Sequence, residues 1–151
     1  MQDLLNREAL KTLGLPDGFS FGLRDRVRFG ELDALNHVNN AVYFKWTENL
    51  RVQIMPIYEL SDFESGDRNF VIRAQSIEYF TPMFLFEEYI LAGRFTRVGN
   101  SSLEMEYEVY VGERMSARIT AQLVMMNADL TASKRVPDAA RAKLLELDGV
   151  S

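Results

Sequence analysis

The feature that most constrains the fold is a helix-forming segment that is apolar around almost its whole circumference. Residues 41 to 55 have the length of a helix, and Pro56 ends the segment because proline cannot continue one. Only a narrow stripe of the expected helix is polar, formed by Lys45, Glu48, Asn49 and Gln53. A helix of this kind has to be buried on most of its sides. The rest of the chain must therefore supply a surface that surrounds it.

Segments with the pattern of β-strands can supply that surface. Residues 23 to 29 alternate with period two, which predicts a first strand before the helix. After an acidic, turn-like stretch at residues 58 to 68, four longer segments are rich in Val, Ile, Phe, Tyr and Met: residues 69 to 80, 87 to 98, 101 to 111 and 114 to 127. The short loops between these four segments predict antiparallel neighbours.

The acidic side chains of residues 101 to 111 indicate which way this sheet faces. Glu104, Glu106 and Glu108 alternate with apolar residues, so we expect that face to meet water. The expected fold is of the α+β class, with one antiparallel sheet of five strands curled about one helix.

The two ends of the chain extend this core, and the length of 151 residues predicts a single domain over residues 1 to 151. Residues 1 to 18 form an N-terminal extension that carries leucines at roughly helical spacing, and residues 137 to 147 form a C-terminal helix with Pro137 in its first turn. Within this region, Gly18 to Gly22 match the G-x-S-x-G pattern of a hydrolase elbow. Because the match follows a turn and precedes a strand, we interpret it as a coincidence.

Composition excludes several classes of function. No apolar run approaches the roughly 18 residues that span a membrane, and charged residues among the first leucines do not fit a signal peptide, so we expect a cytoplasmic protein. With no cysteine and one histidine, a metal site is not expected. The net charge of −5 argues against nucleic acid as a partner, because binding phosphates requires a basic surface.

The residues that could do chemistry are concentrated in the loop at positions 30 to 40, between the first strand and the helix. This loop holds a carboxylate at Asp33, the only histidine at His37, and a pair of asparagines at Asn39 and Asn40.

This loop, in this order of elements, resembles that of the hotdog-fold acyl-CoA thioesterases of the 4-hydroxybenzoyl-CoA thioesterase-like branch. The family pattern D-x-x-G-H-V-N-N-x-x-Y-x-x-x-x-E-x-x-R runs here from Asp33 through Tyr43 to Glu48 and Arg51. Asn36 stands where glycine is usual, and asparagine tolerates left-handed backbone angles better than most residues. Weaker likenesses occur at residues 79 to 82, 99 to 102 and 135 to 137.

The resemblance implies a hotdog fold, in which a curved antiparallel sheet of five strands wraps a long central helix. It also implies an acyl-CoA thioesterase that needs no cofactor, since coenzyme A is part of the substrate, and a homodimer or a tetramer of paired dimers. Association of two copies of the chain is also favoured on physical grounds, because it would protect the edges of the single sheet and cover the remaining face of the single helix.

The resemblance assigns the catalytic roles to Asp33 and to the backbone N–H of Asn40. Asp33 would attack the thioester carbonyl or act as general base on water, and the Asn40 N–H would stabilise the oxyanion at the start of the helix. The plainer alternatives are that Asp33 caps the loop and that Asn39 or Asn40 caps the helix. His37 would either bond Asp33 or the substrate, or only fix the loop.

Three further residues are candidates for contact with the substrate: Asn39, Tyr43 and Glu48. The alternative for Tyr43 is a place in the core. Glu48 could serve as a second carboxylate reached from a partner helix, but we favour an i,i+3 ion pair with Arg51. The phosphates of coenzyme A would need basic residues, for which the candidates are Arg94, Arg97, Lys134 and Arg135.

Two other functions compete with thioester hydrolysis. A hotdog hydratase or dehydratase resembles the pattern D-x-N-P-x-H, whereas here Asp33 and His37 are four residues apart with no proline between them. A module that binds acyl-CoA or acyl carrier protein without catalysis would keep the fold as a scaffold. The presence of Asp33 favours the enzyme.

Overall fold

The computed structural model describes residues 3 to 61 and 70 to 151. Residues 62 to 69, which include most of the stretch expected to be an acidic turn, lie outside the described residues. The elements in chain order are β1 (Leu4–Asn6), α1 (Arg7–Thr12), β2 (Phe21–Arg26), a 3-10 helix η1 (Phe29–Glu31), α2 (Val42–Ile54), β3 (Phe70–Tyr79), β4 (Glu88–Val98), β5 (Ser102–Val111), β6 (Arg114–Met125) and α3 (Asp138–Asp148).

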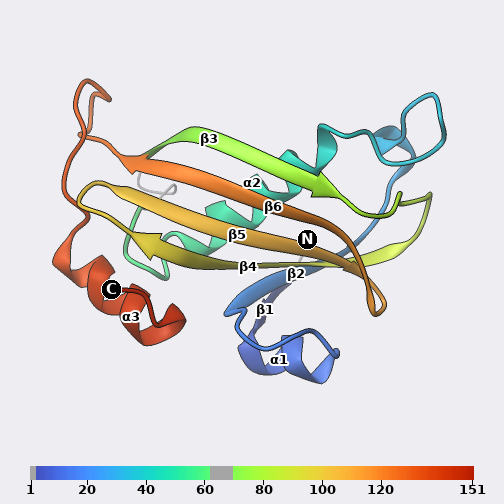
Figure 1. Ribbon diagram of the computed structural model, residues 1–151, viewed down its shortest axis with the longest axis horizontal. Helices are drawn as coiled ribbons and strands as arrows, with labels where there is room; N and C mark the ends of the chain where they lie inside the picture. Colours follow the sequence, from blue (N-terminus) through green and yellow to red (C-terminus); the bar gives the residue numbers. More distant parts are fainter. Residues whose placement is uncertain (1–2, 62–69) are drawn as a thin grey trace.

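The strands of the described residues form one antiparallel sheet in the order β1-β2-β4-β5-β6-β3. Figure 1 shows α2 lying along one face of this sheet, with α1 and α3 at its lower edge. This arrangement confirms the α+β class and the hotdog fold, but the sheet has six strands and not the expected five.

The additional strand is β1, in a region where the leucine spacing predicted a helix. Leu4 and Leu5 instead pair with Leu23 and Gly22 of β2. The helix begins only at Arg7, where the side chain of Asn6 caps it by accepting a hydrogen bond from the N–H of Ala9 at 2.9 Å. Pairing with the exposed edge of β2 thus outcompetes the helical preference of these few residues.

The position of β3 also differs from the prediction. The tight turns around Gly99 and Gly112 make β4, β5 and β6 consecutive neighbours, as expected, but β3 pairs with β6 and not with β4. The connection from β3 to β4 crosses the end of the sheet, where the O of Met83 accepts from the N–H of Val38 and the N–H of Phe86 donates to the O of Val27. The connection therefore carries the chain from β3, at one edge of the sheet, across to β4, and it packs against the loop before α2.

Helix α2 is buried as its composition required. Tyr43, Trp46, Leu50 and Ile54 face the sheet and are at most 3 % exposed, and burial of a large apolar side chain contributes about 1.5–3 kcal/mol. Two buried residues of α2 are polar: Thr47, whose hydroxyl donates to the O of Phe44, and Arg51, which donates to the hydroxyl of Tyr107 at 3.1 Å. Among the described helices, none has the length and hydropathy required to cross a membrane.

The opposite face of the sheet is only partly open to water. The N-terminal residues Leu10, Leu15 and Phe19 pack with Ala92 and Tyr110 into a second, smaller core. Next to it, Glu108 is buried, which corrects the expectation that all the glutamates of this strand face water. The Glu108 carboxylate accepts hydrogen bonds from Arg118 and from the hydroxyl of Tyr110, and these partners compensate for its burial.

Candidate functional site

The loop between β2 and α2 folds into a tight hairpin that fixes the candidate carboxylate. The N–H of Asp33 donates to the O of His37 at 2.9 Å, and the N–H of Asn36 donates to the O of Asp33 at 3.0 Å. Asn36 has a φ of 64°, so this position needs the left-handed conformation that asparagine tolerates in place of glycine. A bridge between Leu32 and Val38 closes the hairpin.

The two oxygens of the Asp33 carboxylate have different environments. Oδ1 accepts a hydrogen bond from the N–H of Leu35 at 2.8 Å, as in the turn-capping alternative. Oδ2 lies 3.7 Å from Nδ1 of His37, which is too long for a hydrogen bond, and accepts none from the described residues. One oxygen therefore orients the group, while the other is available for chemistry. The side chain is about a quarter exposed, so water can reach it.

His37 is held by its backbone as well as being near Asp33. It forms a bridge with Phe84 of the connection between β3 and β4, and its side chain is partly exposed. The ring lines a cavity of about 300 Å³, whose walls are formed by His37, Val38, Asn40, Tyr43, Tyr79, Phe80, Thr81 and Pro82. Fixing the loop and facing a ligand are thus compatible roles for this residue.

The turn before α2 presents the backbone N–H of Asn40 without an acceptor among the described residues. The O of Asn39 accepts from the N–H of Val42, and its Oδ1 accepts from the N–H of Ala41, so Asn39 braces this turn. The N-cap residue of α2 is Ala41, which has no side-chain cap, so neither asparagine is the N-cap that the alternative interpretation expected. Between these bonds, the N–H of Asn40 donates to no group within the described residues, although Asn40 lines the cavity. A free N–H at the positive end of a helix dipole is suited to bind a developing negative charge.

The structure brings some of the predicted residues together and leaves others apart. His37, Asn40 and Tyr43 line the cavity, and Asp33 lies beside His37 but is not part of the wall. Tyr43 is 2 % exposed, so it occupies the core and the cavity wall at once. Burial, with smaller contributions from Tyr79 and Glu87, raises the pKa of Tyr43 to about 12, which keeps its hydroxyl protonated at neutral pH.

The favoured ion pair between Glu48 and Arg51 is wrong. Arg51 turns inward to Tyr107, whereas Glu48 is exposed and forms no ion pair with any described residue. Positions three apart are neighbours on a helix, so the pair fails because the Arg51 side chain is buried against Tyr107 while Glu48 stays in water.

The basic candidates for phosphate binding lie away from this cavity. Arg94 pairs with Glu106, Arg97 lies 4.0 Å from Glu104, and Arg135 pairs with Asp138. None of these, nor Lys134, belongs to the cavity wall formed by the described residues. Within the same residues, no three His, Cys, Asp or Glu side chains gather as a metal site would require.

Two residues that form contacts at the site, Tyr79 and Glu31, are absent from the sequence-based candidates. The hydroxyl of Tyr79, the last residue of β3, donates to the O of Asn40 at 2.6 Å. Glu31 accepts from Nε1 of Trp46 at 2.7 Å and from the N–H of Arg28 at 2.8 Å, so it ties the loop to α2. The sequence gives only a weak signal for Tyr79, through the likeness at residues 79 to 82, and none for Glu31.

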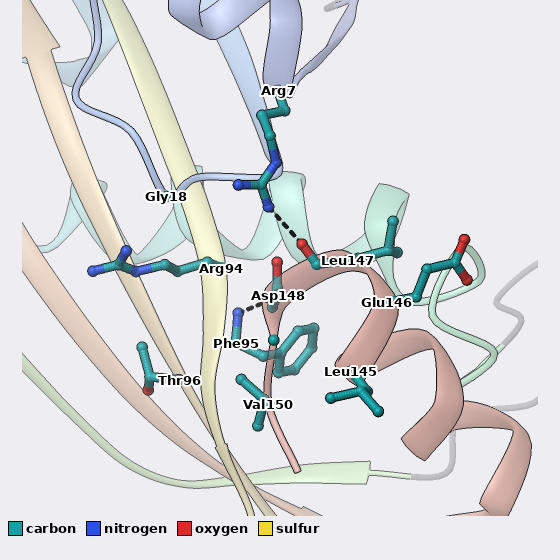
Figure 2. Close-up of a pocket in the computed structure, with 11 residues that line it drawn as sticks. Arg7, Gly18, Arg94, Phe95, Thr96, Leu145, Glu146, Leu147, Asp148 and Val150 are labelled. Carbon is teal, nitrogen blue, oxygen red and sulfur yellow. Dashed lines mark hydrogen bonds between the residues drawn. The ribbon is translucent and has the colours of Figure 1, made fainter.

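A larger hollow, of about 670 Å³, lies between α3 and β4 and is separate from the loop (Figure 2). The carboxylate of Asp148 accepts hydrogen bonds there from the N–H of Phe95 and the hydroxyls of Tyr58 and Ser20, and Arg7 donates to the O of Leu147. Because Arg7 and Asp148 are each bonded to neutral groups of neighbouring elements, we interpret this hollow as a structural seam, meaning a contact region that holds α3 to the sheet. Ser20 belongs to the seam, as expected if its G-x-S-x-G match is a coincidence.

Comparison with family models and with solved structures points to the same family. The model of the thioesterase-like superfamily matches residues 27–144. The crystal structure of a thioesterase superfamily protein from Jannaschia sp. CCS1 is 32% identical and superposes with a TM-score of 0.91, covering 98% of this chain and 95% of that one.

Two further proteins are similar to this chain. A thioesterase from Thermus thermophilus, solved in complex with coenzyme A and Zn, is 30% identical with a TM-score of 0.79, covering 89% of this chain and 98% of that one. The uncharacterized protein YsmA of Bacillus subtilis (strain 168) is 28% identical over 120 residues, which cover 78% of this chain and 79% of YsmA.

Proposed function

This chain belongs to the thioesterase-like superfamily and is a thioester hydrolase, and we propose that it hydrolyses acyl-CoA to a free acid and coenzyme A with Asp33 and the Asn40 N–H. The observation that carries the proposal is the pair of unused groups beside one cavity. Oδ2 of Asp33 accepts no hydrogen bond and the N–H of Asn40 donates none within the described residues. One group can supply a base or nucleophile, and the other can bind the oxyanion.

Hydrolysis by general base would proceed as follows. Oδ2 of Asp33 takes a proton from a water molecule while the water oxygen bonds to the acyl carbon. The carbonyl oxygen becomes an anion, which the Asn40 N–H stabilises at the start of α2. The tetrahedral intermediate then collapses, the carbon–sulfur bond breaks, and the thiolate receives the proton that Asp33 holds.

Attack by Asp33 itself is the other route. Oδ2 bonds to the acyl carbon, the thiolate leaves, and water hydrolyses the resulting anhydride to restore the carboxylate. The Asn40 N–H stabilises the oxyanion in the same place. Both routes use only this chain's residues and water, so we propose no cofactor, and coenzyme A enters as part of the substrate.

Coenzyme A as the carrier is supported by the Thermus thermophilus thioesterase, whose structure contains it. In the cavity, Tyr43 and His37 would contact the acyl thioester, since both line its wall. Asn39 would act through the turn, because its side chain is engaged by the N–H of Ala41.

We further propose that the protein works as a homodimer or as a tetramer of paired dimers. Strand β3 is at the end of the sheet order, and an unpaired strand edge favours association with another chain. Phe80, Phe84 and Phe86 are 47%, 47% and 64% exposed around the cavity and its connection, which suits burial against a second copy. Exposed Glu48 would reach the substrate only in such an assembly. Light scattering of the purified protein tests this, and a monomer would refute it.

The test of function is thiol release from a panel of short, medium, long and aromatic acyl-CoAs. Asp33→Asn should lower kcat by at least about 100-fold, the usual contribution of general acid–base catalysis. Asp17→Asn is the matched control, because Asp17 is exposed in a turn outside the site and should leave turnover unchanged. Absence of release from every acyl-CoA by the folded protein would refute the proposal, and would direct the assay to hydratase reactions and acyl-carrier-protein substrates.

A further inference from the structure

Tyr79 lies where the edge of the sheet meets the start of α2. It is the last residue of β3 and pairs with Ala117 of β6, and the following N–H groups of Phe80 and Thr81 both donate to the O of Ser116. The backbone around Tyr79 is therefore fixed by β6, and its side chain extends from this fixed position toward the cavity, whose wall it joins.

The side chain of Tyr79 makes two contacts where α2 begins, one with Asn40 in the preceding turn and one with Tyr43 in the helix. Its hydroxyl donates to the O of Asn40 at 2.6 Å, across a separation of 39 residues. Its ring packs edge-on against the ring of Tyr43, with centroids 5.4 Å apart and planes at 76°. Both contacts hold the first residues of α2 against the end of β3.

The bond to Asn40 matters because of how the other groups of this turn are used. The side chain and the O of Asn39 bind the N–H groups of Ala41 and Val42, which holds the turn only to itself and to α2. Tyr79 instead holds the turn to the sheet. A shift or rotation of Asn40 would redirect its free N–H away from the oxyanion, and electrostatic stabilisation depends on the direction of such donors.

We propose that Tyr79 is a positioning residue that orients the Asn40 N–H for catalysis. This inference rests on the proposed function, in which that N–H binds the oxyanion. Tyr79 itself does not need to touch the reacting atoms. Burial raises the pKa of Tyr79, so its hydroxyl stays protonated and remains a donor at neutral and mildly alkaline pH.

The test is Tyr79→Phe, which removes the hydroxyl and keeps the ring that packs on Tyr43. Because the lost bond serves the transition state, kcat should fall about 3- to 10-fold, the equivalent of one neutral hydrogen bond, while KM stays within about twofold. Tyr110→Phe is the matched control, since it removes a hydroxyl that donates to Glu108 on the other face of the sheet. It should leave kcat and KM unchanged.

A second measurement does not depend on turnover. In NMR spectra, the amide resonances of Asn40 and Ala41 should shift in Tyr79→Phe and not in Tyr110→Phe. Unchanged resonances in Tyr79→Phe, or an unchanged kcat where the wild type is active, would overturn the positioning role. A wild type that releases no thiol from any acyl-CoA would refute the proposed function, and the amide shifts would still decide whether Tyr79 orients this turn.

Discussion

Removal of the Glu31 carboxylate should loosen the connection between the Asp33 loop and α2. Glu31 accepts hydrogen bonds from Nε1 of Trp46 and from the N–H of Arg28, at 2.7 and 2.8 Å. A hydrogen bond to a charged group contributes about 1.5–3 kcal/mol, but Glu31 is only half-buried, so water replaces part of each bond. Glu31→Ala should therefore lower the free energy of unfolding by about 2 kcal/mol, which corresponds to a melting temperature about 4 to 8 °C lower.

The chain is well suited to this measurement because Trp46 is its only tryptophan. Urea unfolding followed by circular dichroism gives the free energy, and the native emission spectrum reports the surroundings of Trp46. In Glu31→Ala the emission should shift to longer wavelength, since water replaces the carboxylate. Glu31→Gln keeps one acceptor oxygen and should lose only about 1 kcal/mol.

Glu113→Ala is the control, because Glu113 is exposed in the turn between β5 and β6 and should change stability by no more than about 0.5 kcal/mol. The reasoning is refuted if Glu31→Ala is as stable as this control and its Trp46 emission is unchanged. That result would mean that packing of the Trp46 ring alone positions the loop.

Three other outcomes are expected. Asp148→Ala leaves the hydroxyls of Tyr58 and Ser20 and the N–H of Phe95 without their acceptor, so urea unfolding should show a loss of about 3 kcal/mol, and a loss below about 1 kcal/mol would contradict the seam. The pKa of Tyr43 is raised from 10.0 to about 12, so the folded state holds this proton more tightly than the unfolded state. Its stabilising contribution is complete below about pH 10 and is lost as the pH rises toward 12, by about 1.4 kcal/mol per unit. Tyr43→Phe should therefore show a shallower alkaline loss of stability than the wild type, and identical pH curves would disprove this. Finally, dialysis against a chelator should leave kcat within about twofold, because general-base hydrolysis by Asp33 uses no metal, and a chelator-sensitive activity restored by added metal would reject that route.

The sequence alone predicted the central helix, five of the six strands of the described residues and the loop that carries the candidate site. Apolar residues around residues 41 to 55 required a buried helix, and the strand patterns located β2 to β6, though not β1, to within a few residues. The loop motif singled out Asp33 and Asn40, and Asn36 was consistent with the left-handed angle it adopts. These features are local, because helical and strand periods are written in neighbouring side chains.

Only the tertiary structure decided which groups meet. The pairing of β3 with β6, the bond from Tyr79 to Asn40 and the turn of Arg51 toward Tyr107 each join residues far apart in the chain. The sequence pattern shows that a polar residue on a buried face needs a hydrogen-bond partner. Which residue becomes that partner depends on how the sheet packs around α2. For the same reason, the ion pair expected between neighbouring Glu48 and Arg51 does not form, because Arg51 occupies the buried face of the helix.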